Sequence, residues 1–247
     1  MRTFKTMLKT ELKLSFRGID MLIFSICMPI IVIILLGIIY GNKPAFPGAD
    51  YTFLQQSFGA VSAISICAGG LMGLPLVISD YRSKNILKRF KVTPVSPHMI
   101  LFVQLTIYAI YSLVSLLLIY IVAFVFFDFR IVGSVFKYVI SFILVMLSTF
   151  SIGLMVGGIA PNMKIAGIIT SILYFPMLIF SGTTLPYEIM PVPLQKISNL
   201  LPLTQGIKLL KGTSLGLPLE NMFFPILLMF IIIIICVFIS IRFFKWE

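Results

Sequence analysis

Residues 80–98 read DYRSKNILKRFKVTPVSPH and form a basic loop between two long apolar segments. Five of these residues are cationic, and only Asp80 is acidic. A stretch with this many charges does not cross a bilayer core, so the two apolar segments that flank it are separate membrane spans. The name "basic loop" is used below for residues 80–98.

The composition is that of an integral membrane protein. Of the 247 residues, 60% are hydrophobic and 11% are charged, whereas a soluble domain is about a quarter charged. The net charge of +11 would suggest a nucleic-acid partner in a soluble protein. Here the cations lie mostly in short loops between apolar runs, which indicates a role in topology and in binding lipid headgroups. No nucleic-acid partner is expected.

Six apolar segments are long enough to cross a bilayer, which takes about 20 mostly apolar residues. We therefore predict an all-α integral membrane fold, with one transmembrane domain over residues 1–247. The six spans are residues 21–40, 51–79, 99–127, 137–159, 165–182 and 222–241.

The N-terminal segment has an amphipathic pattern. Apolar residues fall broadly on one side of a helix over residues 1–17, while Lys9, Lys13 and Arg17 lie on the other. The pattern predicts a helix within residues 1–20 that lies in the membrane interface, with its cations toward headgroups. A solvated basic tail is the alternative. The apolar residues are Phe4, Met7, Leu8, Leu12 and Leu14.

The distribution of cations predicts the orientation. The N-terminal segment, the basic loop, Lys164 and the C-terminal tail together carry 13 of the 19 Lys and Arg residues. Because cytoplasmic loops are enriched in Lys and Arg, both termini and the basic loop are expected in the cytoplasm. Residues 183–221, which include five prolines, are then external.

The interiors of the predicted spans contain no ionisable side chain other than cysteine and tyrosine. This argues against a proton-driven carrier and an intramembrane metalloprotease, while a Na⁺-coupled carrier stays possible because backbone carbonyls can coordinate an ion. The sequence also lacks the nucleotide-binding pattern GxxxxGK[ST]. Any driven transport would therefore take its energy from another polypeptide. Cys27, Cys67 and Cys236 lie in apolar runs, which argues against a disulfide framework or a metal site.

The basic loop has the pattern of a short docking helix. No Pro or Gly interrupts residues 82–91, and Ile86, Leu87 and Phe90 form an apolar patch flanked by Lys88 and Arg89. Prolines at 94 and 97 end the helix, since a residue before proline is pushed out of the α region. Such a helix suits a groove on a partner. A loop that only fixes topology and contacts anionic lipid fits the same spacing.

Two motifs resemble the ABC-2-type transporter permeases. The run LKRFKVTPVSP, residues 87–97, is similar to the first cytoplasmic loop of that family, with Phe90 in place of Leu. It departs at Asn85, where the family often has Gly, but Asn also tolerates left-handed backbone. It also lacks the acidic residues that the family often carries just before this run.

The second motif is SGTTLPYEIMPVPLQKISNLLPLT, residues 181–204. It resembles the family's external segment between the fifth and sixth spans, with matches at Pro186, Glu188, Pro191 and Pro202. The resemblance implies re-entrant or interfacial helices on the external side. Irregular backbone at membrane depth survives only where protein or water covers it.

The resemblance implies a permease subunit of an ATP-driven ABC exporter in the plasma membrane. Its implied partners are a second permease, identical or sister, and separate ATPase subunits that bind ATP and Mg²⁺. This chain would hold no catalytic residue, cofactor or metal. The basic loop would be the coupling loop that contacts the ATPase, through Arg82, Ile86, Leu87, Lys88, Arg89, Phe90, Thr93 and Pro94.

Two further expectations concern the dimer and the cargo. The family pairs mainly through spans one and five, where small residues allow close approach at Gly37, Gly41, Gly167 and Ser171. Spans without charges favour a hydrophobic or amphipathic cargo, such as a drug, an antibiotic, a peptide or a lipid. The alternatives are a non-transporting sensor or accessory subunit that docks an ATPase or kinase, and an ion-coupled carrier.

Overall fold

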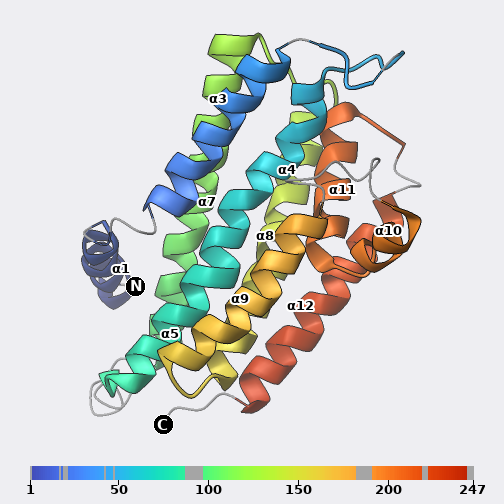
Figure 1. The fold of residues 1–247 in the computed structure, drawn as a ribbon. Helices are drawn as coiled ribbons and strands as arrows, with labels where there is room; N and C mark the ends of the chain where they lie inside the picture. The colour runs from blue at the N-terminus through green and yellow to red at the C-terminus, as the bar shows by residue number, and fades with distance from the viewer. Residues whose placement is uncertain are drawn as a thin grey trace.

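The structure, a computed structural model, describes residues 2–16, 18, 22–41, 43–46, 48–86, 97–181, 191–218 and 222–243. Figure 1 shows a bundle of long helices, and the described residues contain no strand beyond one isolated bridge between Pro44 and Thr52. Six helical segments are long and apolar enough to span a membrane, which confirms the predicted all-α architecture. They are Ile23–Tyr40, Phe53–Ser83, Met99–Phe127, Val135–Ile159, Met163–Phe180 and Phe223–Phe243.

The described helices follow one another along the chain as follows. Helix α1 (Arg2–Ser15) precedes the first span, which consists of η1 (Ile23–Cys27) and α3 (Met28–Tyr40). The second span consists of α4 (Phe53–Cys67), the π-helical η2 (Ala68–Gly73) and α5 (Leu74–Ser83). The remaining helices are α7 (Pro97–Phe127), α8 (Val135–Ile159), α9 (Met163–Phe180), α10 (Val192–Ser198), α11 (Pro202–Leu215) and α12 (Phe223–Phe243).

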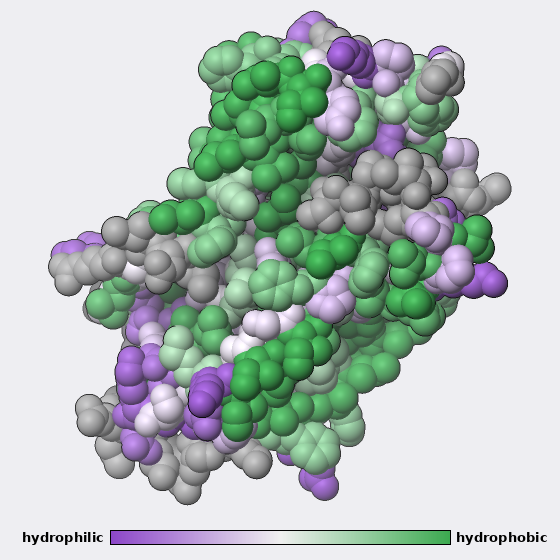
Figure 2. Space-filling view, viewed as in Figure 1, coloured by the Kyte–Doolittle hydropathy of each residue, from purple (hydrophilic) through white to green (hydrophobic). Residues whose placement is uncertain are grey.

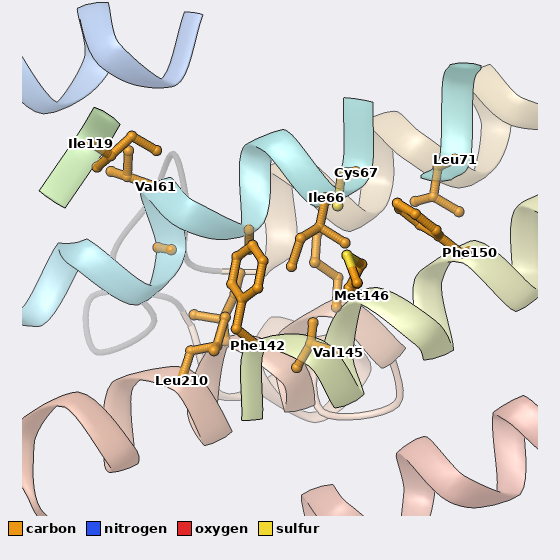
Figure 3. Close-up of a cluster of buried hydrophobic side chains, with 14 of the residues drawn as sticks. Val61, Ile66, Cys67, Leu71, Ile119, Phe142, Val145, Met146, Phe150 and Leu210 are labelled. Carbon is orange, nitrogen blue, oxygen red and sulfur yellow. The ribbon is translucent and has the colours of Figure 1, made fainter. Parts of the chain in front are cut away.

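The second span is the centre of the bundle. Its apolar stretch is 78% buried, against 61% for α8 and between 17% and 28% for the other four spans. Figure 3 shows the contact that holds this centre together, in which side chains of the second span face those of α8. Aromatic and aliphatic groups from α7 and α11 complete the cluster, which includes Val61, Ile66, Leu71, Ile119, Phe142, Val145, Met146, Phe150 and Leu210.

Glycines allow the second span and α8 to meet backbone to backbone. A Cβ added to Gly153 of α8 would lie 1.9 Å from the carbonyl oxygen of Gly70 in η2. A Cβ on Gly70 would in turn lie 2.5 Å from the ring of Phe150. Only residues without a side chain permit this approach, as in other membrane helix pairs.

The remaining spans present apolar side chains outward. Figure 2 shows apolar side chains over most of this face, with hydrophilic ones gathered at the upper end and at the lower left, where α1 and α5 lie in Figure 1. Many of the large exposed apolar residues lie on spans that surround the centre, among them Ile38, Phe126, Ile172 and Phe238. This distribution is the one a lipid environment requires.

The start of the basic loop differs from the sequence prediction in two ways. The second span continues through Ser83 and does not end at Ser79, so Asp80 and Arg82 belong to α5. The predicted continuous helix over residues 82–91 is wrong, because Lys84 and Asn85 form a turn in which Asn85 has a φ of 55°. Asn is among the few non-glycine residues that adopt this left-handed backbone readily.

Helices α10 and α11 follow α9 and precede α12 in the chain, within the segment that the sequence analysis predicts to be external. Figure 1 shows α11 beside the upper part of α4, and most of its residues are buried. Gly59 of α4 makes this contact close, since a Cβ there would lie 3.0 Å from the backbone nitrogen of Lys211. Helix α11 is thus a packed part of the bundle and not a surface loop.

Candidate functional site

Arg82 is the buried cation at the base of the basic loop. Its side chain is 5% exposed and donates hydrogen bonds to the carbonyl oxygens of Gly157 at 3.1 Å, of Gly158 at 3.0 Å, and of Ala160. These carbonyls end α8, where backbone oxygens lack intrahelical partners and the helix dipole is negative. The prediction that Arg82 contacts an ATPase therefore needs correction, because its guanidinium is used inside the bundle.

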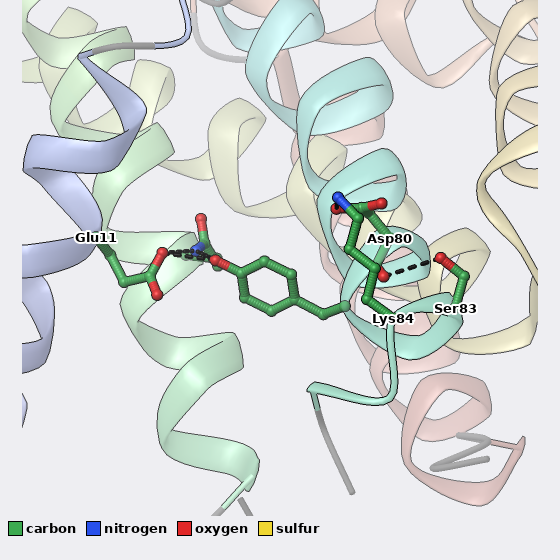
Figure 4. A network of polar contacts seen from close by, with 6 residues as sticks. Glu11, Asp80, Ser83 and Lys84 are labelled. Atoms are coloured by element: carbon green, nitrogen blue, oxygen red, sulfur yellow. Dashed lines mark hydrogen bonds and ion pairs between the residues drawn. The ribbon is translucent and has the colours of Figure 1, made fainter. Parts of the chain in front are cut away.

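Tyr81, the neighbour of Arg82, binds a different helix. Its hydroxyl donates to Oε2 of Glu11 on α1 at 2.6 Å, and Nε2 of Gln104 on α7 donates to the same oxygen at 3.0 Å. Gln104 also donates to the Tyr81 hydroxyl at 3.1 Å. Figure 4 shows this network between α1 and the end of α5. The two helices that flank the basic loop, α5 and α7, are thus joined to each other and to α1.

Helix α1 packs on the bundle through the apolar face that the sequence predicts. Phe4, Met7, Leu8 and Leu12 are partly buried against the core, while Lys9 and Lys13 are exposed. The predicted amphipathic helix is therefore confirmed, and its place in the membrane interface stays a prediction. Two details differ.

Leu14, placed on the apolar side by the sequence argument, is 52% exposed, and Glu11 faces inward in its place. The inward position of Glu11 could have been found from helical spacing. One face of a helix carries residues 4, 7, 8, 11, 12 and 15. The Ser15 hydroxyl, on the same face, accepts a hydrogen bond from Tyr111 of α7 at 2.8 Å. The sequence analysis did not assign Glu11 to either face, because it considered only the apolar residues and the cations of this segment.

The residues that begin the exposed part of the basic loop are Asp80, Lys84 and Ile86. The Lys84 ammonium lies 2.7 Å from Oδ2 of Asp80, with the Lys84 side chain 64% exposed, and Ser83 donates to the Asp80 carbonyl at 2.9 Å (Figure 4). Ile86 is half-buried. The other residues predicted to contact a partner lie outside the described residues, so their roles stay predictions: Leu87, Lys88, Arg89, Phe90, Thr93 and Pro94.

Replacing Tyr81 with Phe is expected to loosen α1. The substitution keeps the ring and removes the donor nearest to Glu11, which costs about 2 kcal/mol for a bond to a charged group. Limited trypsin digestion of the purified chain should then cleave after Lys9 and Lys13 several-fold faster than in the wild type. The control is Lys84→Ala, which removes an exposed ion pair worth at most about 1 kcal/mol. Equal cleavage of both variants would show that Glu11 does not anchor α1.

The second family-like motif, residues 181–204, is partly described. Pro191 caps the start of α10, and Pro202 is the first residue of α11, where its missing N–H costs no helical hydrogen bond. Pro186 and Glu188 lie outside the described residues. A pocket of about 330 Å³ opens beside this segment, and within its lining Lys208 donates to Oδ1 of Asn199 at 2.5 Å.

The residues predicted to pair two permeases have different surroundings. Gly37 is buried, and a Cβ there would lie 2.2 Å from the ring of Phe127 in α7. Its close approach is made within its own chain, so the prediction that Gly37 contacts a second permease is wrong. Gly41 ends α3 with a φ of 53°. Gly167 and Ser171 are half-buried on α9, and their pairing role, like that of Gly41, stays a prediction.

Within the part of the chain that the structure describes, no three His, Cys, Asp or Glu residues are grouped as metal ligands would be. The polar groups at the base of the basic loop are instead arranged to join helices. Tyr81 connects α5 to α1 and α7, and Arg82 connects α5 to α8. Both connections start from the end of α5, so a displacement there acts on α1, α7 and α8.

Comparison with known proteins gives a family-level match. A family model described as ABC-2 type transporter matches residues 2–215. Nodulation protein J of Rhizobium leguminosarum bv. viciae is 35% identical over 71 residues, which are 29% of this chain and 27% of that protein. Nodulation protein J of Neorhizobium galegae is 34% identical over 71 residues, with the same shares of the two chains. The chain thus covers about a quarter of the length of these curated relatives.

Proposed function

Because this chain belongs to the ABC-2 type transporter family, we propose that it is the permease subunit of an ATP-driven exporter whose ATP is bound by a separate subunit. The observation that carries the proposal is how the basic loop is attached. The loop continues directly from α5, the end of the most buried span, and leads into α7. A displacement of the loop therefore acts on the centre of the bundle.

The basic loop is the proposed docking site for the ATPase. Asn85, just after α5, has left-handed backbone, so the chain that follows it need not continue along the axis of the span. In the proposed contact Ile86, Leu87 and Phe90 enter a groove on the partner, and Lys88 and Arg89 bind the rim of that groove. The Thr93-Pro94 pair would stiffen the loop behind this contact. Arg82 is no longer part of this contact.

The proposed cargo is hydrophobic or amphipathic. Ionisable groups other than Cys and Tyr in the described spans are confined to residues near their ends, such as Asp80, Arg82 and Lys137. A pathway along the described helices would be lined by apolar, aromatic and hydroxyl groups. A drug, a lipid-like antibiotic, a peptide or a lipid fits such a lining, and export is the direction proposed. A second permease, identical or sister, completes the proposed assembly in the plasma membrane.

The orientation can be tested by labelling single cysteines. In a chain carrying Cys27→Ser, which removes the exposed native thiol, a membrane-impermeant maleimide should label Val132→Cys in intact cells. Lys164→Cys should be labelled only after permeabilisation, because the positive-inside rule places the turn between α8 and α9 in the cytoplasm. Both positions are exposed, so accessibility within the protein does not limit labelling. The reverse pattern would contradict cytoplasmic termini.

Purification of the tagged chain from its native membrane tests the proposed function. The expected result is co-isolation of a polypeptide that contains the GxxxxGK[ST] pattern, with ATP hydrolysis that orthovanadate inhibits. A sensor or accessory subunit would co-isolate with an ATPase or kinase but would give no ATP-dependent movement of a lipophilic dye in reconstituted vesicles. A chain that purifies alone and moves substrate on an ion gradient would contradict the proposal.

A further inference from the structure

Arg82 joins the two connections that, by the predicted orientation, lie on the cytoplasmic side. Its own helix, α5, leads into the basic loop, and its three carbonyl partners lie at the end of α8. Ala160, one of those partners, is followed within three residues by the first turn of α9. A single side chain thus bridges the loop between the second and third spans and the turn between the fourth and fifth.

The bridge is stiff. Hydrogen bonds from a guanidinium are charge-assisted, and its planar fork holds several acceptors in fixed directions. The backbones are also close at this level, since a Cβ on Gly157 would lie 3.1 Å from both the Cβ of Ile78 and the Cα of Pro75. At 5% exposure, Arg82 exchanges few of these bonds for water.

A cation that served only to anchor the basic loop to headgroups would lie at the surface, as Lys84 does. A cation that served only to end α8 would need no connection to the basic loop. Arg82 combines a buried cap on α8 with a position directly before Ser83, the first exposed residue at this end of the loop. A mechanical connection between the basic loop and the end of α8 requires both of these properties in one residue.

We propose that Arg82 is a positioning residue that carries movement of the basic loop to the turn between α8 and α9, so that one docking event moves both pairs of spans. This inference rests on the proposed function, because it needs a partner that moves the loop. Without Arg82 the loop would still bind the partner, but less of its movement would reach the turn between α8 and α9.

The experiment measures distances by double electron–electron resonance in the complex of this chain with its co-isolated ATPase. Spin labels are placed on Ser83→Cys at the loop, Lys164→Cys at the turn, and Val132→Cys as the external reference, after removal of the three native cysteines. All three positions are exposed. The Val132 reference is next to Gly133, whose N–H donates to the Ser214 carbonyl of α11 at 2.8 Å. Each pair is measured without nucleotide and with ATP plus orthovanadate.

The expected wild-type result is that the 83–132 and 164–132 distances both change with ATP, while the 83–164 distance stays constant. In Arg82→Lys the 83–132 change should remain and the 164–132 change should fall at least threefold, because an ammonium cannot hold three carbonyls as the guanidinium does. Lys84→Ala, which removes an exposed cation two residues further along, is the matched control and should leave the 164–132 change intact.

An 83–164 distance that changes as much as the other two in the wild type would overturn the inference without any variant. An unchanged 164–132 response in Arg82→Lys would also overturn it, while the proposed function would stand. If neither distance to residue 132 responds to ATP in the wild type, the proposed function falls, and the inference falls with it.

Discussion

A chain carrying Gly153→Ala is expected to lose its folded bundle. The new Cβ would lie 1.9 Å from the Gly70 carbonyl oxygen, and the clash is with backbone, which cannot move aside by changing a rotamer. Helix α8 and the second span, the two most buried of the described spans, would have to separate. Overpacking of a well-packed core costs about 1–3 kcal/mol and sometimes more, and a contact between two backbones belongs at the upper end of that range.

The measurement is the midpoint temperature of thermal unfolding of the detergent-solubilised chain. Elution as a monodisperse species shows beforehand that the variant has accumulated in folded form. Gly167→Ala is the matched control, because its Cβ would meet only the Leu76 side chain, at an ordinary 3.7 Å. Gly167→Ala should unfold at the wild-type temperature, whereas Gly153→Ala should unfold about 10 °C lower, the shift that about 3 kcal/mol gives in a chain of this size, or fail to accumulate. Equal stability of the two variants would contradict the close packing of α8 on η2.

The second large effect is expected in the basic loop and concerns activity instead of stability. Replacing Lys88, Arg89 and Phe90 together with Ala should lower transport-coupled ATP hydrolysis in the complex at least tenfold. A hot spot of one buried aromatic and two cations typically contributes several kcal/mol to an interface, of which about 1.4 kcal/mol already gives a factor of ten. The variant should fold normally, because the helices on both sides of the loop are held by Tyr81, Arg82 and Gln104.

A triple variant on the opposite side of the bundle provides the control. Arg130, Phe136 and Lys137 are all exposed, and Phe136 is 74% exposed. Replacing these three with Ala removes the same types of side chain from a region that is predicted to be external. ATP hydrolysis should be unchanged in this control. A comparable loss in both variants would mean that the effect comes from lost charge and not from a docking contact.

The spans and their order could be predicted from the sequence, because a run of about 20 consecutive apolar residues is typical of a transmembrane helix. The start of α9 at Met163 was also predictable, since Asn162 can cap a helix, and its side chain accepts from the Ile165 N–H at 2.9 Å. At Asn85 the sequence analysis noted that Asn tolerates left-handed backbone, but it still predicted a helix through this residue, which the observed φ of 55° interrupts. Each of these features depends on a few neighbouring residues.

Features that depend on distant partners could not be predicted in this way. Arg82 was read with the other cations of the basic loop, because its acceptors, the carbonyls of Gly157, Gly158 and Ala160, are about 75 residues away in the chain. The position of Gly37 depends likewise on Phe127, in a different span. Small residues in a membrane helix show that something packs closely there, but not whether it belongs to the same chain.

The most direct test of energy transfer through the basic loop is photocrosslinking from position 90. Phe90 is replaced by p-benzoylphenylalanine in the full-length chain in its native membrane, with the same replacement at Phe136 as the control. We predict that illumination links position 90 to a polypeptide containing the GxxxxGK[ST] pattern, identified by mass spectrometry, and that position 136 gives no such product. Crosslinks from position 90 to lipid alone, or the same product from both positions, would contradict docking of an ATPase on this loop.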